Sequence, residues 1–287
     1  MKKKVKSWIS TAAMFLLMLA GAGIMAYPSV SSWWNSFHQT QALSDYDSIV
    51  QKIEDYDKYF DEADAYNEKL RQLGSQFTEY DKIHDDYQSA LNVAGTGMIG
   101  YISIEKLDIS LPIYHGTSED VLNAAAGHLE GTSLPVGGKG THAVISSHRG
   151  LPTAKLFTNL DEMEKGDTFT LTVLNRTLTY EVDQIVVVLP TQTDDLRIEE
   201  GKDYCTLVTC TPYGVNSHRM LVRGHRIKNK DAAVKAGSEA ELVSFKKCSI
   251  LTLAAVLAVM FVSVMLKKNK KKKKITLDDV LDIAKAE

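Results

Sequence analysis

Apolar side chains are concentrated in two long runs, one near each end of the chain. Residues 8–26 (WISTAAMFLLMLAGAGIMA) and residues 248–266 (CSILTLAAVLAVMFVSVML) are almost wholly apolar, and lysines flank both runs. About 20 apolar residues cross a bilayer as a helix, and dense lysine flanks are typical of its cytoplasmic side. We therefore expect two transmembrane helices, with both chain ends in the cytoplasm and the rest exported. The first run is alternatively a cleaved signal peptide, because small residues at 20–22 suit a cleavage site.

Between the first apolar run and residue 97 the pattern is that of amphipathic helices. Apolar and aromatic residues recur three and four positions apart over residues 49–73, with Asp, Glu and Lys between them. A weaker helical stretch follows over residues 77–91. We expect this apolar stripe to dock on the neighbouring domain; the alternative is a coiled coil with a partner. Trp33 and Trp34 are typical of an interfacial membrane anchor, or else pack against the domain.

From Met98 onward the pattern becomes that of strands. Short runs rich in β-branched and aromatic residues are separated by turn residues. Many strands with only brief helices favour a closed or nearly closed β-barrel. Short helices are expected at residues 119–126, capped by Thr117 or Ser118, and at residues 153–157. The predicted strands are residues 99–104, 109–114, 142–147, 168–174, 178–189, 205–208 and 219–227.

The exported part of the chain is acidic. The whole chain of 287 residues has a net charge of −3, but residues 27–245 contain 19 lysines and arginines against 32 aspartates and glutamates, a net charge of −13. This excess argues against binding of nucleic acid and against lying flat on anionic lipid. A partner with a basic surface fits better.

Three cysteines bear on the chemistry: Cys205, Cys210 and Cys248. Cys205 and Cys210 lie five positions apart along a predicted strand, so they face opposite sides of the sheet and do not pair with each other. An exported protein that keeps an unpaired cysteine often has a use for it.

Cys210 stands at the end of its strand, before a turn that carries Pro212 and Gly214, and Arg219 lies on the returning strand. A thiol becomes a useful nucleophile as the thiolate, which needs a base or a cationic neighbour. His148, in the stretch SSHRG, supplies either. Arg219 stays protonated, so it suits donation of hydrogen bonds to a carbonyl or an oxyanion. Cysteine, histidine and arginine together point to acyl transfer through a thioester.

Each of these residues also has a simpler interpretation. A cysteine that ends an apolar strand is more often a small buried residue, and a single histidine is more often structural. His128, His142 and His148 lack a recognisable metal-ligand spacing, and no cysteine lies near them in the sequence. Arg149, beside His148, is expected to be structural.

The sequence around these residues decides between the interpretations. TLVTCTPYGVNSHR resembles the catalytic signature of the sortases, which are membrane-anchored cysteine transpeptidases of Gram-positive bacteria. The stretches GYISIEKLDISLPIYHGTS, AAGHLEGTSLPVGG and HAVISSHRGLPTAKLF resemble the pilus-assembling branch, class C, as does a C-terminal membrane segment. The resemblance covers about residues 98–228. The family pattern falls on His148, Thr206, Leu207, Thr209, Cys210 and Arg219.

This resemblance implies a sortase-type closed β-barrel, mainly β with short helices, on the extracellular face of the membrane. It implies recognition of an LPXTG-like C-terminal sorting signal on a secreted protein such as a pilin. Cys210 is then the nucleophile, His148 the general acid and base, Arg219 the oxyanion donor, and Thr209 a residue that orients the substrate backbone. No metal or organic cofactor is implied.

The acceptor of the acyl group is left open by the resemblance. A pilus enzyme transfers it to a lysine amine of the next pilin, whereas a wall-anchoring sortase uses an amine of a peptidoglycan precursor. A catalytically dead barrel that only binds pilin tails is the alternative from another functional class.

One segment departs from the class C pattern. Pilus sortases typically carry a lid before the barrel, with an Asp-Pro-aromatic motif that plugs the active site. The corresponding residues 76–87 (QFTEYDKIHDDY) have no such motif. This argues against inhibition by that motif, although Phe77, Tyr80 and Tyr87 are aromatic residues able to cover a site.

The expected organisation has six parts. They are a cytoplasmic tail with the first membrane helix (1–26), an extracellular helical region (27–97), the catalytic barrel (98–230), a linker (231–247), the second membrane helix (248–266) and a lysine-rich cytoplasmic tail (267–287).

Overall fold

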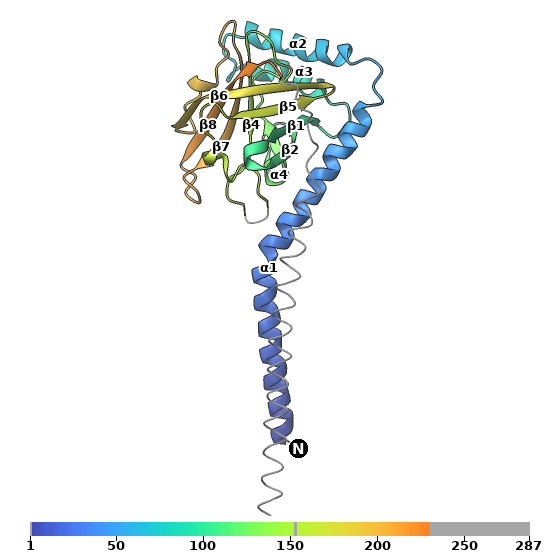
Figure 1. Cartoon of the computed structure of the whole chain (residues 1–287), viewed down its shortest axis with the longest axis vertical. Coiled ribbons are helices and arrows are strands. Elements are labelled where there is room, and N and C mark those ends of the chain that lie inside the picture. The colour runs from blue at the N-terminus through green and yellow to red at the C-terminus, as the bar shows by residue number, and fades with distance from the viewer. Residues whose placement is uncertain (1, 152–153, 230–287) are drawn as a thin grey trace, which may run out of the picture. The chain divides into compact units, whose positions relative to one another are not determined.

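The strands close into a β-barrel, as predicted, although the barrel has eight strands where seven were expected. The computed structural model describes residues 2–151 and 154–229, and places the strands in the order β1-β2-β3-β4-β7-β8-β6-β5 (Figure 1). The pairs β2–β3 and β4–β7 are parallel, and the other neighbours are antiparallel. The strands are β1 (Met98–Ile104), β2 (Ile109–His115), β3 (Ala126–His128), β4 (Thr141–Ser146), β5 (Thr168–Val173), β6 (Arg176–Val188), β7 (Asp203–Thr211) and β8 (His218–Ile227).

Helices precede the barrel and occupy its connections. In α4 the Ser118 hydroxyl accepts a hydrogen bond from Val121 N, which confirms one of the two predicted N-caps. The helices are α1 (Lys2–Val50), α2 (Asp57–Gln72), α3 (His84–Ser89) and α4 (Glu119–Ala124), with 3₁₀ turns η1 (Tyr80–Ile83), η2 (Glu105–Leu107), η3 (Leu160–Glu162) and η4 (Asp194–Leu196).

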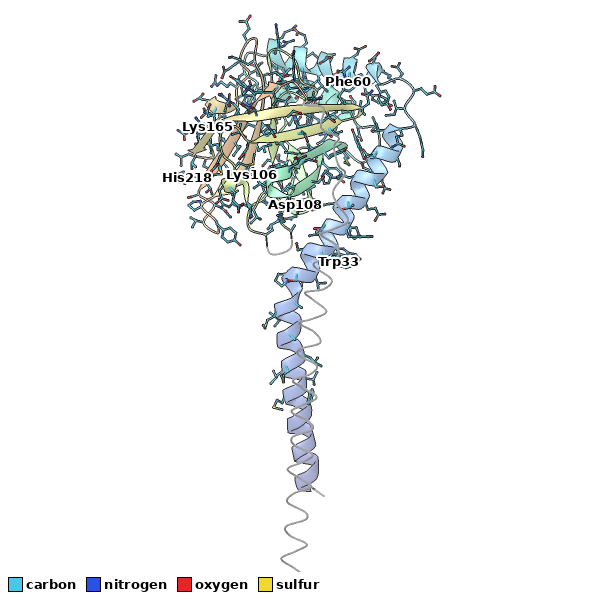
Figure 2. All side chains as sticks on the ribbon, in the orientation of Figure 1. Trp33, Phe60, Lys106, Asp108, Lys165 and His218 are labelled. Carbon is cyan, nitrogen blue, oxygen red and sulfur yellow. The ribbon has the colours of Figure 1, made fainter. Side chains whose placement is uncertain are left out.

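Helix α1 contains the first apolar run and continues well beyond it. Within the described residues, the segment Ala13–Val50 is the one helical stretch long and apolar enough to cross a membrane. Trp33, labelled in Figure 2, and Trp34 remain on its surface. Their rings contact each other and the nearby Phe37 and His38. The predicted linker, second membrane helix and lysine-rich tail lie outside the described residues.

The apolar stripe of the helical region docks on the barrel, as expected. Phe60, Tyr66 and Leu70 of α2 belong to the same buried cluster as the barrel interior. Tyr46 of α1 donates a hydrogen bond to Ile99 O at 3.0 Å and accepts one from Leu174 N at 3.0 Å. These contacts bury aromatic surface and satisfy its hydroxyl groups, so the helices are part of the folded domain.

Three local predictions differ from the structure. The stripe over residues 49–73 is not one helix, because α1 ends at Val50 and Asp55 Oδ1 accepts from Asp57 N to start α2. Strand β3 was not predicted. The predicted helix at residues 153–157 is wrong for the part that the structure describes, where the chain turns and then enters η3.

Candidate active site

The two faces of β7 separate its two cysteines. Cys205 points into the barrel and is 0 % exposed, and burial raises the pKa of its thiol far above the usual value. Cys210 lies five positions further on the opposite face and is half-buried. Neither forms a disulfide. Cys210 is therefore the cysteine of this strand that a substrate can reach.

Arg219 lies directly across the ladder from Cys210. Strands β7 and β8 are antiparallel with Cys210 opposite Arg219, and opposed residues point to the same side of a sheet. Nη1 of Arg219 donates to Asn216 O at 3.2 Å and to His218 O at 3.1 Å, so the turn backbone fixes the guanidinium. In the described part of the chain, no carboxylate pairs with it.

His148 follows the strand on the other side of β7. Strands β4 and β7 are parallel, with Ser146 opposite Val208. The ladder continues beyond this pair, since Ser147 N donates to Val208 O at 3.1 Å. Two positions after Val208 comes Cys210, and two after Ser146 comes His148. Two parallel strands thus end together, with the histidine and the cysteine in equivalent positions.

A small cluster of buried apolar residues lies on the same face of the sheet as Cys210. It contains Val144 of β4, Val208 of β7 and Leu221 of β8, together with Leu196 of η4. Val208 is opposite Leu221, two residue pairs along the ladder from the Cys210–Arg219 pair and therefore on the same face. We call these four residues the catalytic-face cluster. Phe77, Leu129, Val186 and Val188 pack against it.

The family profile described as "Sortase domain" matches residues 102–227. The crystal structure of sortase C1 from Streptococcus agalactiae is 50% identical, with a TM-score of 0.64 over 66% of this chain and 100% of that one. The chain belongs to the sortase family. Sortase C from Streptococcus pneumoniae, in a structure whose title names pilin substrate specificity, is 43% identical with a TM-score of 0.58, covering 67% of this chain and 100% of that chain.

Curated relatives match over a shorter stretch. Sortase A of Streptococcus agalactiae serotype III (strain NEM316) is 31% identical over 153 residues, which cover 52% of this chain and 60% of that protein. Sortase D of Bacillus subtilis (strain 168) is 29% identical over 131 residues, 45% of this chain and 63% of that protein. The chain thus spans about three-fifths of the length of these two relatives.

Thr209 of this sortase lies on the inner face of β7, between the outward-facing Val208 and Cys210. It is 1 % exposed, and its hydroxyl donates to Ser147 O at 2.9 Å. This bond ties the end of β7 to the residue before His148. Contact of Thr209 with the substrate backbone stays a prediction, and the occupied hydroxyl does not favour it.

Arg149 makes contacts that the sequence did not indicate. Its Nη2 lies 2.6 Å from Asp161 Oδ2 of η3, and its Nη1 donates to Thr211 Oγ1 at 3.4 Å. The neighbours of Arg149 and Thr211 in the chain are His148 and Cys210. A structural role was expected for Arg149, and these contacts show which chain segments it connects.

The other two histidines considered as metal ligands, His128 and His142, are hydrogen-bonded within the domain. His128 Nε2 lies 2.8 Å from Ser133 O, and His142 lies within hydrogen-bond distance of Arg197 O and Thr206 Oγ1. Burial lowers the pKa of His128 to about 3 and also lowers that of His142. Among the described residues, no group of three or more His, Cys, Asp or Glu side chains could hold a metal ion.

Residues 76–87, where class C enzymes carry the lid, cross the barrel in this sortase. Gln76 Nε2 donates to Gly131 O at 3.2 Å, and Gln76 Oε1 accepts from Ile198 N at 3.1 Å. Phe77 packs against the catalytic-face cluster, whereas Tyr87 is buried with His128. Of the three aromatic residues expected to cover a site, Phe77 is the one in contact with this cluster.

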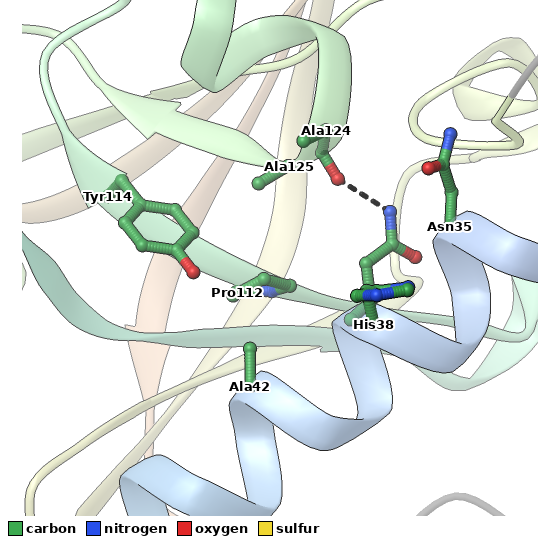
Figure 3. Close-up of a pocket in the computed structure, with 8 residues that line it drawn as sticks. Asn35, His38, Ala42, Pro112, Tyr114, Ala124 and Ala125 are labelled. Atoms are coloured by element: carbon green, nitrogen blue, oxygen red, sulfur yellow. Dashed lines mark hydrogen bonds between the residues drawn. The ribbon is translucent and has the colours of Figure 1, made fainter. Parts of the chain in front are cut away.

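A small cavity lies elsewhere on the domain. It has a volume of about 100 Å³ and lies between α1 and the part of the barrel formed by β2 and α4. Gln39 Nε2 donates to Ala124 O at 2.7 Å. This hydrogen bond is the dashed line that ends at Ala124 in Figure 3. None of its lining residues belongs to the catalytic-face cluster or to the Cys210, His148 and Arg219 group.

Proposed function

We propose that this sortase is a membrane-anchored cysteine transpeptidase that cleaves an LPXTG-like sorting signal between Thr and Gly and transfers the acyl group to an amine. The observation that carries the proposal is the ladder register. Cys210 lies opposite Arg219, and His148 occupies the equivalent position at the end of the parallel neighbour. This register supports the proposal because it brings a cysteine, a histidine and an arginine, residue types suited to nucleophile, base and oxyanion donor, to one end of the barrel.

The first half of the reaction forms a thioester. The Cys210 thiol gives its proton to His148, and the sulfur attacks the carbonyl carbon of the Thr–Gly bond. Arg219 donates hydrogen bonds to the oxyanion that develops on that carbonyl. When the intermediate collapses, the C–N bond breaks, and His148 protonates the leaving glycine amine.

The second half returns the enzyme to its starting state. An acceptor amine attacks the thioester carbon, and His148 takes the proton that the amine loses. The C–S bond then breaks as the new amide forms, and the Cys210 sulfur recovers a proton. No external oxidant, reductant or cofactor is needed for this balance.

The rim of the catalytic-face cluster suits the apolar part of a sorting signal. Leucine and proline side chains of the signal would bury against Val186 and Val188, which pack on the cluster and stay partly exposed, with Val188 opposite Arg219 in the ladder. Burial of a leucine side chain contributes about 1.5–3 kcal/mol, which is part of the binding free energy that a short peptide needs.

A pilin lysine is the acceptor that the observations favour. Structural relatives at 39–50% identity include sortase C1 of the pilus island 1 of group B Streptococcus and the pneumococcal enzyme whose title names pilin substrate specificity. The net charge of −13 over residues 27–245 attracts a protonated lysine on a partner surface. Helix α1 would hold the domain at the membrane, where it meets newly secreted proteins.

The reaction class is tested by trapping the acyl-enzyme. The full-length protein in detergent micelles is incubated with an LPXTG peptide and hydroxylamine, and the hydroxamate is measured by mass spectrometry. We expect a hydroxamate that ends at the threonine, and no product from the Cys210→Ala variant. A Cys210→Ala variant that still assembles pili in cells would favour the binding scaffold instead.

The acceptor is tested by competition. A lysine-containing pilin domain and a peptidoglycan stem peptide are offered together, at equal concentration, to the enzyme and the LPXTG peptide. We expect the pilin adduct to dominate. Preferential formation of the stem-peptide adduct would identify a wall-anchoring enzyme and leave the thioester chemistry intact.

A further inference from the structure

Arg149 joins the two chain segments that carry the cysteine and the histidine. It follows His148 directly, and its Nη1 donates to the hydroxyl of Thr211, the residue after Cys210. Its Nη2 makes an ion pair of 2.6 Å with Asp161 of η3. One guanidinium thus connects the loop after β4, the end of β7 and a 3₁₀ turn.

The side chain of Arg149 is withdrawn from solvent. Its exposed fraction is 11 %, against 42 % for Asp161. The Nε atom is buried and has no hydrogen-bond partner among the described residues. Thr211 is buried and faces the inner side of β7, opposite to the face that presents Cys210. The guanidinium therefore lies behind the cysteine, outside the space where a substrate would meet the sulfur.

The loop that carries His148 is fixed by further contacts from the same direction. His148 O accepts from Phe157 N at 3.1 Å, and Gly150 N donates to Thr158 Oγ1 at 3.2 Å. Gly150 has a φ of +78°, and a Cβ there would lie 2.5 Å from the Tyr213 ring. The backbone after His148 thus approaches the β7–β8 turn closely, and the Asp161–Arg149–Thr211 chain spans the same two segments.

We propose that Arg149, held by Asp161, is a positioning residue that sets the distance between the His148 imidazole and the Cys210 sulfur. The proposal rests on the proposed function of that pair. Arginine suits this task because its planar fork donates in two directions at once, whereas a lysine ammonium is a point charge on a flexible stem. Misplacement of a reacting group by about 1 Å can cost 10²-fold in rate.

The test measures kcat and KM separately for LPXTG peptide cleavage by the full-length protein in detergent. Arg149→Lys keeps the charge, and Asp161→Asn keeps the shape of the partner. We expect both to lower kcat by about 10- to 100-fold, with KM changed less than about twofold. The matched control is Arg71→Lys, which alters an arginine whose ion pair with Glu68 is on the surface, and it should retain wild-type kcat.

A second readout separates positioning from loss of structure. The rate at which a small neutral alkylating reagent modifies Cys210 should fall in Arg149→Lys and Asp161→Asn, while the thermal unfolding midpoint changes by only a few degrees. Because Asp161→Asn is the milder change, it keeps the test decisive if Arg149→Lys unfolds.

Two outcomes overturn the proposal. Wild-type kcat in both variants, with Cys210→Ala inactive, would refute the positioning role and leave the proposed function standing. A rise in KM with unchanged kcat would show that Arg149 contacts substrate. An active Cys210→Ala variant, by contrast, would refute the proposed function itself.

Discussion

The side of the barrel covered by helices and the end that carries Cys210 differ in how their polar side chains are hydrogen-bonded. On the helical side, the buried Tyr87 hydroxyl lies 3.0 Å from His128 Nδ1 and accepts from Gly116 N at 2.8 Å. Tyr46 is likewise bonded on both sides. At the other end, Cys210 and Arg219 are half-buried and, among the described residues, have no side-chain partner. The bonded tyrosine hydroxyls hold the fold together, whereas a half-buried thiol and a guanidinium held by backbone carbonyls through Nη1 leave hydrogen-bonding groups for a substrate.

Replacing each of the two cysteines of β7 by alanine should give the largest difference in activity between the two regions. Cys210→Ala removes the nucleophile and should lower peptide cleavage by on the order of 10⁴-fold or more. Cys205→Ala, five residues away on the same strand, should keep kcat and KM and cost about 1 kcal/mol of unfolding free energy. Steady-state kinetics and urea denaturation of both variants measure the contrast. Equal loss of activity in the two would remove the distinction between the faces of β7.

Arg219 should give the next largest effect. Replacement by lysine retains a positive charge but loses the fork that the Asn216 and His218 carbonyls orient. We expect kcat to fall by about 10²- to 10³-fold, the usual cost of an oxyanion donor, with little change in KM. The control is Arg223→Lys, four residues along β8, whose guanidinium already pairs with Asp183. Comparable rates for wild type and Arg219→Lys would contradict the assigned role.

The buried histidines predict how stability depends on pH. Because burial holds the pKa of His128 at about 3, below the unfolded value near 6.5, protonation favours the unfolded chain. Stability contributed by neutral His128 is therefore present above pH of about 6.5 and is lost as the pH falls toward about 3. His115 and His142 shift in the same direction.

Replacing His128 by glutamine tests this linkage. The variant is expected to be less stable at neutral pH, but its unfolding free energy should fall less steeply with acid, by about 1.4 kcal/mol per pH unit. Chemical denaturation at a series of pH values gives the slope. An unchanged slope would mean that His128 does not titrate between the two states.

Replacement of Phe77 should give the smallest effect, a change in KM. It tests whether this side chain covers the catalytic-face cluster in the absence of the Asp-Pro-aromatic motif. If Phe77 shields the catalytic-face cluster from substrate, Phe77→Ala should lower KM for the peptide by about two- to tenfold, because a larger fraction of the enzyme is open. Tyr80→Ala is the matched control, since that ring packs against Gly131. An unchanged or higher KM in Phe77→Ala would argue against a covering role.

Much of the fold could be predicted because its signals are local. Alternation and turn residues located seven of the eight strands, and Cys210 and Arg219 flank a turn visible in the sequence. Strand β3 was not predicted, because its three residues include Gly127 and follow α4 without an apolar run. The end of helix α1 at Val50 was not predicted, because Ile53 and Tyr56 continue the helical spacing across the turn that follows.

Non-local pairing accounts for the rest. That β4 lies parallel to β7, about 60 positions away in the chain, is invisible to periodicity, yet it brings His148 toward Cys210. His148 was a candidate base by its residue type, and the resemblance to sortases then matched it to the histidine of the family. Arg149 was assigned a structural role for want of a partner, because nothing local connects it with Asp161 or Thr211. A side chain that bridges three segments has no periodic signature.

The most direct measurement is the mass of the enzyme trapped with its substrate. Full-length protein is mixed with an LPXTG peptide without any amine acceptor, quenched in acid and digested. We expect an acyl adduct, ending at threonine, on the peptide that contains Cys210, and a much weaker one in His148→Ala. An adduct on another residue, or cleavage of the signal with no covalent intermediate in any quenched sample, would contradict it.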